Sequence, residues 1–204
     1  MSKKLQKALT VMVIMNIFRT PLIETERLFL TWPSAKQIDQ YHNDIINSNM
    51  FETIHWDGPK EKNHSGELQD YWRDCSKNNP DDYSQSFELA IIEKSSELYI
   101  GGTGLRTSSS SFLNLGYALA PKYHGKGFAT EAVKGLVDEA FRKRKAERIF
   151  ACIFKGNIAS RKVAEKAGLS FEGIQRRSSF KNGKWIDDWL LAITRPDWEQ
   201  QDIY

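Results

Sequence analysis

The stretch of sequence that decides the fold reads Leu113-Asn-Leu-Gly-Tyr-Ala-Leu-Ala-Pro121 and continues as Lys122-Tyr-His-Gly-Lys-Gly-Phe-Ala-Thr130. The first part is predicted to be a strand, and the second is a turn that contains two glycines. A helix is predicted from Thr130 to Arg144, because apolar residues recur there at the period of a helix packed on a sheet. These residues are Val133, Leu136, Val137, Ala140 and Phe141. The order is therefore strand, glycine turn, helix.

A turn of this kind favours a bound phosphate or pyrophosphate. It leaves backbone N–H groups free at the positive end of a helix dipole. Gly125 and Gly127 let the backbone approach an anion closely, and Lys126 adds a cation. An ordinary glycine-rich turn that needs positive φ angles is the alternative. No Walker loop occurs, and Thr130 stands where the Rossmann fingerprint has its third glycine.

The rest of the chain predicts a mixed α/β sheet in one domain. Three strands in a run, joined by short polar turns, are typical of antiparallel neighbours, and Asn182-Gly183 is the strongest hairpin signal. The predicted strands are 26–32, 86–92, 98–106, 112–119 and 148–154, with a loop at Thr107–Ser111 and two last strands around the Asn182-Gly183 turn. The predicted helices are 34–47 capped by Ser34, 65–77, 130–144, and 158–167 capped by Asn157 and ended by Gly168.

Composition excludes several classes of protein. The 204 residues are 40% hydrophobic and 27% charged, which is typical of a globular domain. The longest apolar run, Val11 to Met15, is too short to span a membrane. A net charge of +3 gives no reason to expect nucleic acid as a partner. Cys75 and Cys152 fit neither a disulfide framework nor a zinc spacing, and the four scattered histidines predict no metal site. We expect a cytoplasmic protein without a membrane partner.

Residues 1–20 are predicted to be an N-terminal extension to a domain that spans residues 21–204. The extension has a basic start and a short apolar run, as a secretory signal does. Thr10 and Asn16 interrupt that run, and no small-x-small cleavage site follows it. The pattern therefore favours an extension over a signal peptide.

The turn and its flanks resemble a known family. His124-Gly-Lys-Gly-Phe-Ala129 is similar to the acetyl-CoA motif Gln/Arg-x-x-Gly-x-Gly/Ala of the GNAT N-acetyltransferases. Residues 157–173 resemble the Asn-x-x-Ser helix and the Gly-Phe-x-x-Glu-Gly strand of the RimJ/RimL type, the ribosomal-protein N-terminal acetyltransferases. Thr25-Glu-Arg-Leu28, Trp56-Asp-Gly-Pro59 and residues 181–187 also fall where that type has them, so the resemblance covers Leu22 to Trp198.

The resemblance implies the GNAT fold, an α/β (α+β) architecture with a mixed, mostly antiparallel central sheet, two splayed parallel strands and flanking helices. It implies acetyl-CoA as acetyl donor, with the pantetheine arm between strands 112–119 and 148–154. The main chain near Leu119 would polarise the thioester carbonyl, and Asn157 would orient the cofactor arm. The cofactor-binding residues that it implies are Leu119, His124, Gly125, Lys126, Gly127, Phe128, Ala129, Thr130 and Asn157. His124 stands where the family usually has Gln or Arg.

The resemblance also implies direct transfer of the acetyl group to a primary amine, most simply a protein N-terminus, with Ser160 as the catalytic residue that places a hydroxyl near sulfur. Ala164 stands where many members have a tyrosine for that proton, and Asn114 where relatives often have an acid. Without the resemblance, Asn157 and Ser160 are ordinary helix-capping residues. The candidates for the general base are Glu88, Asp187, Asp188 and His55.

The acceptor is the least predictable part of the site. We expect its pocket to be built from the Phe51–Pro59 loop and the Arg176–Trp185 hairpin. A small amine, such as a polyamine, an amino-acid derivative or an antibiotic, is the second hypothesis for the acceptor. A non-catalytic acyl-CoA-binding module is the third, and the protein is expected to be a monomer or a homodimer. Cys152 is predicted to be a small buried hydrophobe and not a nucleophile.

Overall fold

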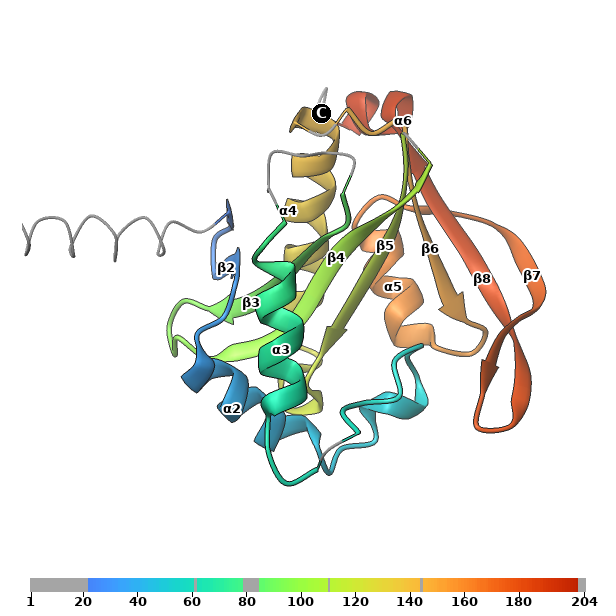
Figure 1. Ribbon diagram of the computed structural model, residues 1–204. Coiled ribbons are helices and arrows are strands. Elements are labelled where there is room, and N and C mark those ends of the chain that lie inside the picture. Colours follow the sequence, from blue (N-terminus) through green and yellow to red (C-terminus); the bar gives the residue numbers. More distant parts are fainter. Residues whose placement is uncertain (1–21, 61, 79–84, 110, 144, 202–204) are drawn as a thin grey trace, which may run out of the picture.

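In the described part of the chain, eight strands form one sheet in the order β1-β2-β3-β4-β5-β6-β8-β7 (Figure 1). The computed structural model describes residues 22–60, 62–78, 85–109, 111–143 and 145–201, so the predicted extension at residues 1–20 lies outside the described residues. The strands are β1 (Ile23–Glu24), β2 (Leu28–Thr31), β3 (Phe87–Glu93), β4 (Tyr99–Ser109), β5 (Phe112–Leu119), β6 (Arg148–Phe154), β7 (Ser170–Lys181) and β8 (Lys184–Thr194). The helices are α2 (Ala35–Ile45), α3 (Gly66–Cys75), α4 (Phe128–Lys143), α5 (Ile158–Lys166) and α6 (Arg195–Gln201), with 3-10 turns η1 (Met50–Glu52) and η2 (Pro121–Tyr123).

Strands β5 and β6 are parallel neighbours that separate along their length. Their pairing begins with Phe112 opposite Arg148 and ends with Asn114 opposite Phe150. Beyond that point β5 continues against β4, while β6 continues against β8. The two strands diverge toward their C-terminal ends (Figure 1). This arrangement confirms the splayed parallel pair, and it opens the sheet just before the glycine turn.

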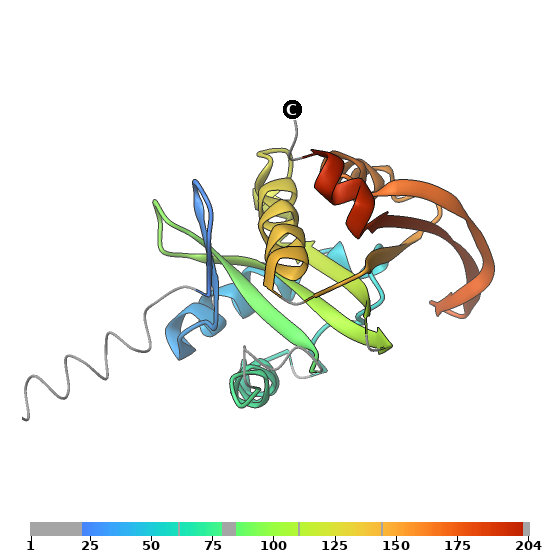
Figure 2. The ribbon, with the colours of Figure 1, turned by 90° about the horizontal axis from the view of Figure 1, so that it is seen from above.

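Helices cover both faces of the sheet (Figure 2): α4 crosses one face, and α2 and α3 lie on the other. The predicted apolar stripe of α4 is confirmed, because all five of its members are at most 2% exposed: Val133, Leu136, Val137, Ala140 and Phe141. Burying a side chain the size of Leu or Phe stabilises the fold by ~1.5–3 kcal/mol. The stripe therefore anchors α4, and the first turn of the helix with it.

Helix caps and turns follow the predicted chemistry. Ser34 caps α2 in a capping box with Gln37, and Asn157 caps α5 by accepting from the Ser160 amide. In the β7–β8 turn, Asn182 has φ +49° and Gly183 has φ +75°, as a type I′ hairpin turn requires. These local predictions are confirmed.

Three details differ from the predictions. The loop predicted at Thr107–Ser111 is partly wrong, because β4 runs through Ser109 and its exposed end pairs with β5. Helix α4 begins at Phe128, two residues before the predicted start. Helix α6 was not predicted, since its main anchor is tertiary: Trp198 stacks on Phe141 with ring centroids 5.4 Å apart.

Candidate active site

The glycine turn has the backbone geometry that an anion requires. Gly125 and Gly127 have φ angles of +76° and +82°, a region that favours glycine. The turn leads into α4, whose first-turn amides, those of Phe128, Ala129 and Thr130, have no acceptor within the helix. A Cβ added to Gly125 would meet no heavy atom within 4 Å. The outer side of the turn is therefore open, and its amides lie at the positive end of the α4 dipole.

Arg27 and Thr25 hold this turn in place through Glu131 of α4. Glu131 accepts from the Thr25 hydroxyl at 2.6 Å, from the Arg27 amide at 2.7 Å and from Arg27 Nε at 2.6 Å. Arg27 Nη1 also donates to the carbonyl oxygen of Lys126 at 3.0 Å. Burial opposes ionisation of Glu131, but these hydrogen bonds and the Arg27 charge outweigh it and lower the pKa of Glu131. The Thr25-Glu-Arg-Leu28 motif is thereby explained as a clamp on the turn.

The side chains of the turn point to several different neighbours. His124 Nε2 donates to the carbonyl oxygen of Leu119 at 3.0 Å, so this imidazole joins the turn to the end of β5. Lys126 Nζ lies 5.5 Å above the Tyr123 ring. Phe128 is buried and offers only its main chain to a ligand. The turn can therefore meet an anion chiefly through backbone amides and Lys126.

A cavity of about 600 Å³ begins in the gap between β5 and β6 and extends across the sheet to α3. It is lined by the unpaired halves of both strands, by α5, by the 53–56 loop, and by aromatic and charged residues of α2, α3, β3 and β4. The lining residues are Tyr41, Thr53, Ile54, His55, Trp56, Glu67, Leu68, Tyr71, Trp72, Glu88, Tyr99, Gly102, Thr103, Arg106, Asn114, Leu115, Gly116, Tyr117, Ala118, Ala151, Cys152, Ile153, Phe154, Asn157 and Ser160. The gap and the space beneath α3 are thus one continuous chamber.

Ser160 and Tyr117 form a hydroxyl pair in this chamber. Ser160 Oγ donates to the Tyr117 hydroxyl at 2.9 Å, and that hydroxyl donates to the main-chain oxygen of Ser160 at 2.8 Å. Burial raises the pKa of Tyr117 to about 12. The Asn157 side chain accepts from the Ser160 amide and donates to the Thr53 carbonyl, both at 3.0 Å. Sequence reasoning missed Tyr117, because no local pattern links it to a helix 43 residues away.

Glu88 lies in the α3 half of the cavity. Its carboxylate pairs with Arg106 Nε at 3.0 Å. Burial raises the pKa of Glu88 against the lowering effect of the Arg106 charge. A Cβ on Gly104 would overlap the Glu88 carboxylate and the main-chain oxygen of Phe87, so glycine at this position leaves room for the Glu88 side chain. Of the predicted base candidates, Glu88 and His55 line the chamber.

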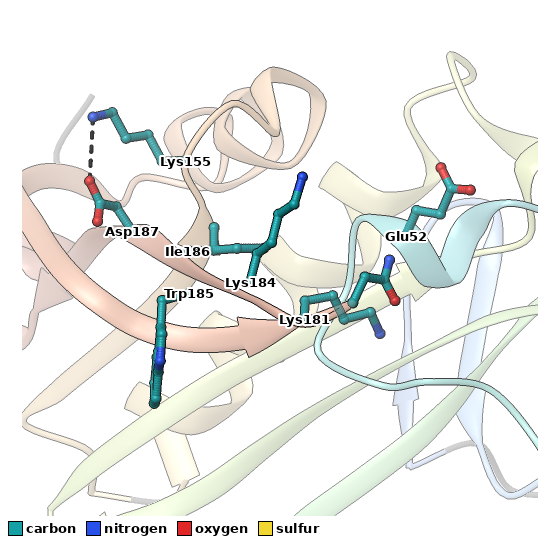
Figure 3. Close-up of a pocket in the computed structure, with 8 residues that line it drawn as sticks. Glu52, Lys155, Lys181, Lys184, Trp185, Ile186 and Asp187 are labelled. Carbon is teal, nitrogen blue, oxygen red and sulfur yellow. Dashed lines mark ion pairs between the residues drawn. The ribbon is translucent and has the colours of Figure 1, made fainter.

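A second hollow of about 570 Å³ lies beside the β7–β8 hairpin (Figure 3). It is lined by Glu52, Lys155, Lys181, Asn182, Lys184, Trp185, Ile186 and Asp187. Asp187 accepts from the Arg177 amide, which is the main cause of its lowered pKa, and it faces Lys155 at 3.5 Å. Figure 3 shows Lys184 and Trp185 projecting from opposite sides of β8. Asp187 therefore belongs to this hollow and not to the chamber.

The predicted acceptor pocket needs a correction. The 53–56 part of the loop lines the chamber as expected, but the hairpin lines the second hollow instead. The reason is that Lys181 Nζ donates to the Trp56 carbonyl at 3.0 Å and to Asp57 at 2.5 Å, which packs the hairpin against the loop. Helix α3 supplies part of the cavity wall that the hairpin was expected to form.

Cys152 is only partly buried and lines the cavity, so the prediction of a buried side chain is wrong. Its thiol donates to Gln175 at 3.3 Å. Burial, followed by the charge of Asp188, raises the pKa of Cys152, which disfavours the nucleophilic thiolate. Within the described ranges, no group of three or more His, Cys, Asp or Glu side chains could hold a metal ion. No helix in the same part of the chain is long and apolar enough to cross a membrane.

These features define a class of protein. A strand, a glycine turn and a helix stand beside two parallel strands that separate, and a cavity runs from that gap. The open turn fits a pyrophosphate, and the gap fits an extended arm that ends in the cavity. This is the arrangement that the sequence resemblance implies for acetyltransferases that use acetyl-CoA.

Comparison with known proteins identifies the family. Residues 27–170 match the family described as acetyltransferase (GNAT) domain. The chain is 39% identical over 119 residues to the probable N-acetyltransferase YjcK of Bacillus subtilis, covering 57% of this chain and 66% of YjcK. It is 32% identical over 84 residues to the ribosomal protein uS5 alanine N-acetyltransferase of Escherichia coli, covering 41% of this chain and 43% of that enzyme. The matched region therefore spans less than two thirds of either relative.

The fold is also similar to that of the spermidine N-acetyltransferase of Vibrio cholerae, solved in complex with CoA and spermine. The TM-score is 0.70 at 18% identity, covering 86% of this chain and 99% of that one. The chain belongs to the GNAT acetyltransferase family, whose members are enzymes that use acetyl-CoA. The resemblance, the fold class and the cofactor expected from the sequence are thus confirmed.

Proposed function

We propose that this protein transfers the acetyl group of acetyl-CoA directly to the α-amine of a protein N-terminus. The observation that carries this proposal is the single chamber that joins the gap between β5 and β6 to the space beneath α3. A donor arm entering through the gap and an amine entering from the α3 side would meet inside it. Such an arrangement holds two reactants together and makes their reaction effectively unimolecular.

Within this proposal, the backbone around the glycine turn holds the pyrophosphate. The amides from Gly125 to Thr130 face it at the helix N-terminus, and Lys126 adds a positive charge. The main chain near Leu119 polarises the thioester carbonyl, as a preorganised donor does for developing negative charge. Asn157 orients the arm from its place between α5 and the 51–59 loop. His124 supports the turn through its bond to Leu119.

Ser160 supplies the proton that the departing thiolate needs. Its hydroxyl lines the chamber and is bonded to Tyr117. Tyr117 keeps its own proton near neutral pH, because burial raises its pKa to about 12. The pair can therefore pass a proton toward sulfur and recover one through the second hydroxyl.

The charges of the chamber favour an acceptor with one amine. Two carboxylates, Glu67 and Glu88, line it together with the guanidinium of Arg106. Glu88 already pairs with Arg106, and Glu67 accepts from the Lys60 amide. A polyamine brings several positive charges that this lining does not balance. A peptide α-amine brings one, and its reference pKa of ~7.7–8.0 leaves part of it neutral at pH 7.

Release of free CoA thiol from acetyl-CoA tests the proposal. The acceptors are peptides with free N-termini, the same peptides with blocked N-termini as matched controls, spermidine, and single amino acids. We expect turnover with free N-termini and none with the blocked peptides. Preferential turnover of spermidine or another small amine would contradict the acceptor, and CoA binding without thiol release for any acceptor would favour a non-catalytic module.

Further properties of the protein stay predictions. We propose the domain boundaries 1–20 and 21–204 and a cytoplasmic location. We propose that the protein is a monomer or a homodimer, which a measurement of molecular mass in solution tests.

A further inference from the structure

A buried carboxylate lies behind the chamber, next to the loop that carries His55. The Asp188 side chain is 3% exposed. Its Oδ2 accepts from the Ser178 hydroxyl at 2.6 Å and from the Ser179 hydroxyl at 2.5 Å. Its Oδ1 is buried and has no hydrogen-bond partner among the described residues. A buried charge is costly unless it is paired, so this carboxylate needs an explanation.

A bulge in β7 turns the two serines toward that carboxylate. Gln175 pairs with Asp188 and Ser179 pairs with Ile186, so three residues of β7 lie opposite the single residue Asp187 of β8. In the bulge, Arg177 has φ +50°, an uncommon conformation for a residue other than glycine. Bulges are frequent next to active sites, where they redirect side chains. Here the bulge directs two hydroxyl groups at one carboxylate.

The hydrogen bonds of the network fix which nitrogen of His55 carries a proton. Ser179 gives its only proton to Asp188, so its oxygen can only accept at the 3.0 Å contact with His55 Nε2. Nε2 therefore holds the proton, and a neutral His55 keeps a lone pair on Nδ1. None of the described residues forms a hydrogen bond with Nδ1. The imidazole lines the chamber, packed against Phe154 with ring centroids 4.4 Å apart.

We propose that His55 is the general base of the acetyl transfer, and that Ser179 and Asp188 are positioning residues that orient its ring. This inference rests on the proposed function. Nδ1 takes a proton from the acceptor ammonium, whose nitrogen then attacks the acetyl carbon. The new C–N bond forms as the C–S bond breaks. The thiolate takes a proton from Ser160, the extra proton on the amide nitrogen returns through solvent to the Ser160–Tyr117 pair, and the imidazolium later gives its own proton to water.

The surroundings of His55 suit this role. Asp188 of β8 is a charged group facing the ring, with its Oδ2 3.7 Å from Nε2, and it stabilises the imidazolium formed in the step. Ser179 of β7 and Phe154 of β6 make neutral contacts with the ring. The other base candidates are engaged elsewhere, Glu88 with Arg106 and Asp187 with Lys155.

The test compares His55→Gln with the wild type on a free peptide N-terminus, at saturating acetyl-CoA and over a range of pH. We expect kcat to fall by about 10²-fold or more, the lower end of what a general base contributes, while the Kd of acetyl-CoA stays unchanged. The deficit should shrink as pH rises through ~8, because the acceptor amine then loses its proton unaided. Combining Asp188→Asn with His55→Gln should cause no further loss, since the residues act as one unit.

The matched control is Glu172→Gln. It weakens the Arg148–Glu172 pair, another side-chain contact of β7, whose two residues do not line the chamber, and should leave kcat unchanged. A His55→Gln variant within threefold of the wild type, or equally impaired at every pH, would overturn the inference while leaving the proposed function intact. A wild type that releases no thiol with any acceptor would overturn both. If circular dichroism shows that His55→Gln does not fold, the second test is His55→Ala with added imidazole. Recovery of turnover by imidazole would support His55 as the general base, and no recovery would contradict it.

Discussion

Replacing Gly127 by alanine is expected to weaken acetyl-CoA binding by about one to two orders of magnitude. Gly127 has φ +82°, where an L side chain costs ~1–2 kcal/mol, and its Cβ would lie 3.3 Å from Arg27 Nη2. Relief of this strain moves the first-turn amides of α4 away from the pyrophosphate. Losing one hydrogen bond to a charged group costs ~1.5–3 kcal/mol, a factor of about 10–150 in Kd.

Gly183→Ala is the matched control for this experiment. Gly183 has φ +75° in the β7–β8 turn, and a Cβ there meets no heavy atom within 4 Å. The backbone cost is therefore similar, but the glycine turn is untouched. Titration calorimetry with acetyl-CoA and urea unfolding should show that both variants lose stability and that only Gly127→Ala loses affinity. Equal affinity of Gly127→Ala and the wild type would refute the phosphate assignment.

Three further predictions concern the hydroxyl pair, the clamp and the α5 cap. Ser160→Ala should lower kcat by about 10²-fold with little change in the Kd of acetyl-CoA, and unchanged turnover in steady-state kinetics would remove Ser160 from the mechanism. Glu131→Gln should lose ~1–3 kcal/mol of stability at pH 7. The pKa of Glu131 is lowered, so the wild type is more stable than the variant above pH 4.5, the ordinary pKa of a glutamate, and this difference disappears as pH falls through the lowered pKa. The same stability difference at all pH values in urea unfolding would contradict this. Asn157→Ala should cost ~1 kcal/mol through the lost cap, visible as a lower Tm, and an unchanged Tm would show that the cap is dispensable.

The parts of the fold that sequence could predict are those set by local chemistry. The strands 112–119 and 148–154 were predicted with the observed bounds, because each is a short apolar run bounded by turn or cap residues. The Asn182-Gly183 turn and the Asn157 cap depend on residues within a few positions of each other. Helix α6 escaped prediction, since Trp198 finds its partner on α4 and not on its own helix.

The candidate site was predictable only where a motif is continuous in the chain. The glycine turn is such a motif, and so is the Asn-x-x-Ser start of α5. The clamp from Arg27 to Glu131 and the contact of His55 with Ser179 join residues 104 and 124 positions apart. Nothing in one sequence gives those pairings, because they arise when the sheet brings its strands together. For the same reason, α3 was not foreseen as a wall of the chamber.

Mass spectrometry of one reaction product tests the central claim most directly. The substrate is a peptide with a free N-terminal α-amine and one internal lysine, incubated with acetyl-CoA and the protein. Fragmentation locates any acetyl group that has been added. The account predicts a single acetyl group on the N-terminal α-amine, formed in step with free CoA. An acetyl group on the lysine, or an unmodified peptide alongside rapid acetylation of a small amine, would contradict it.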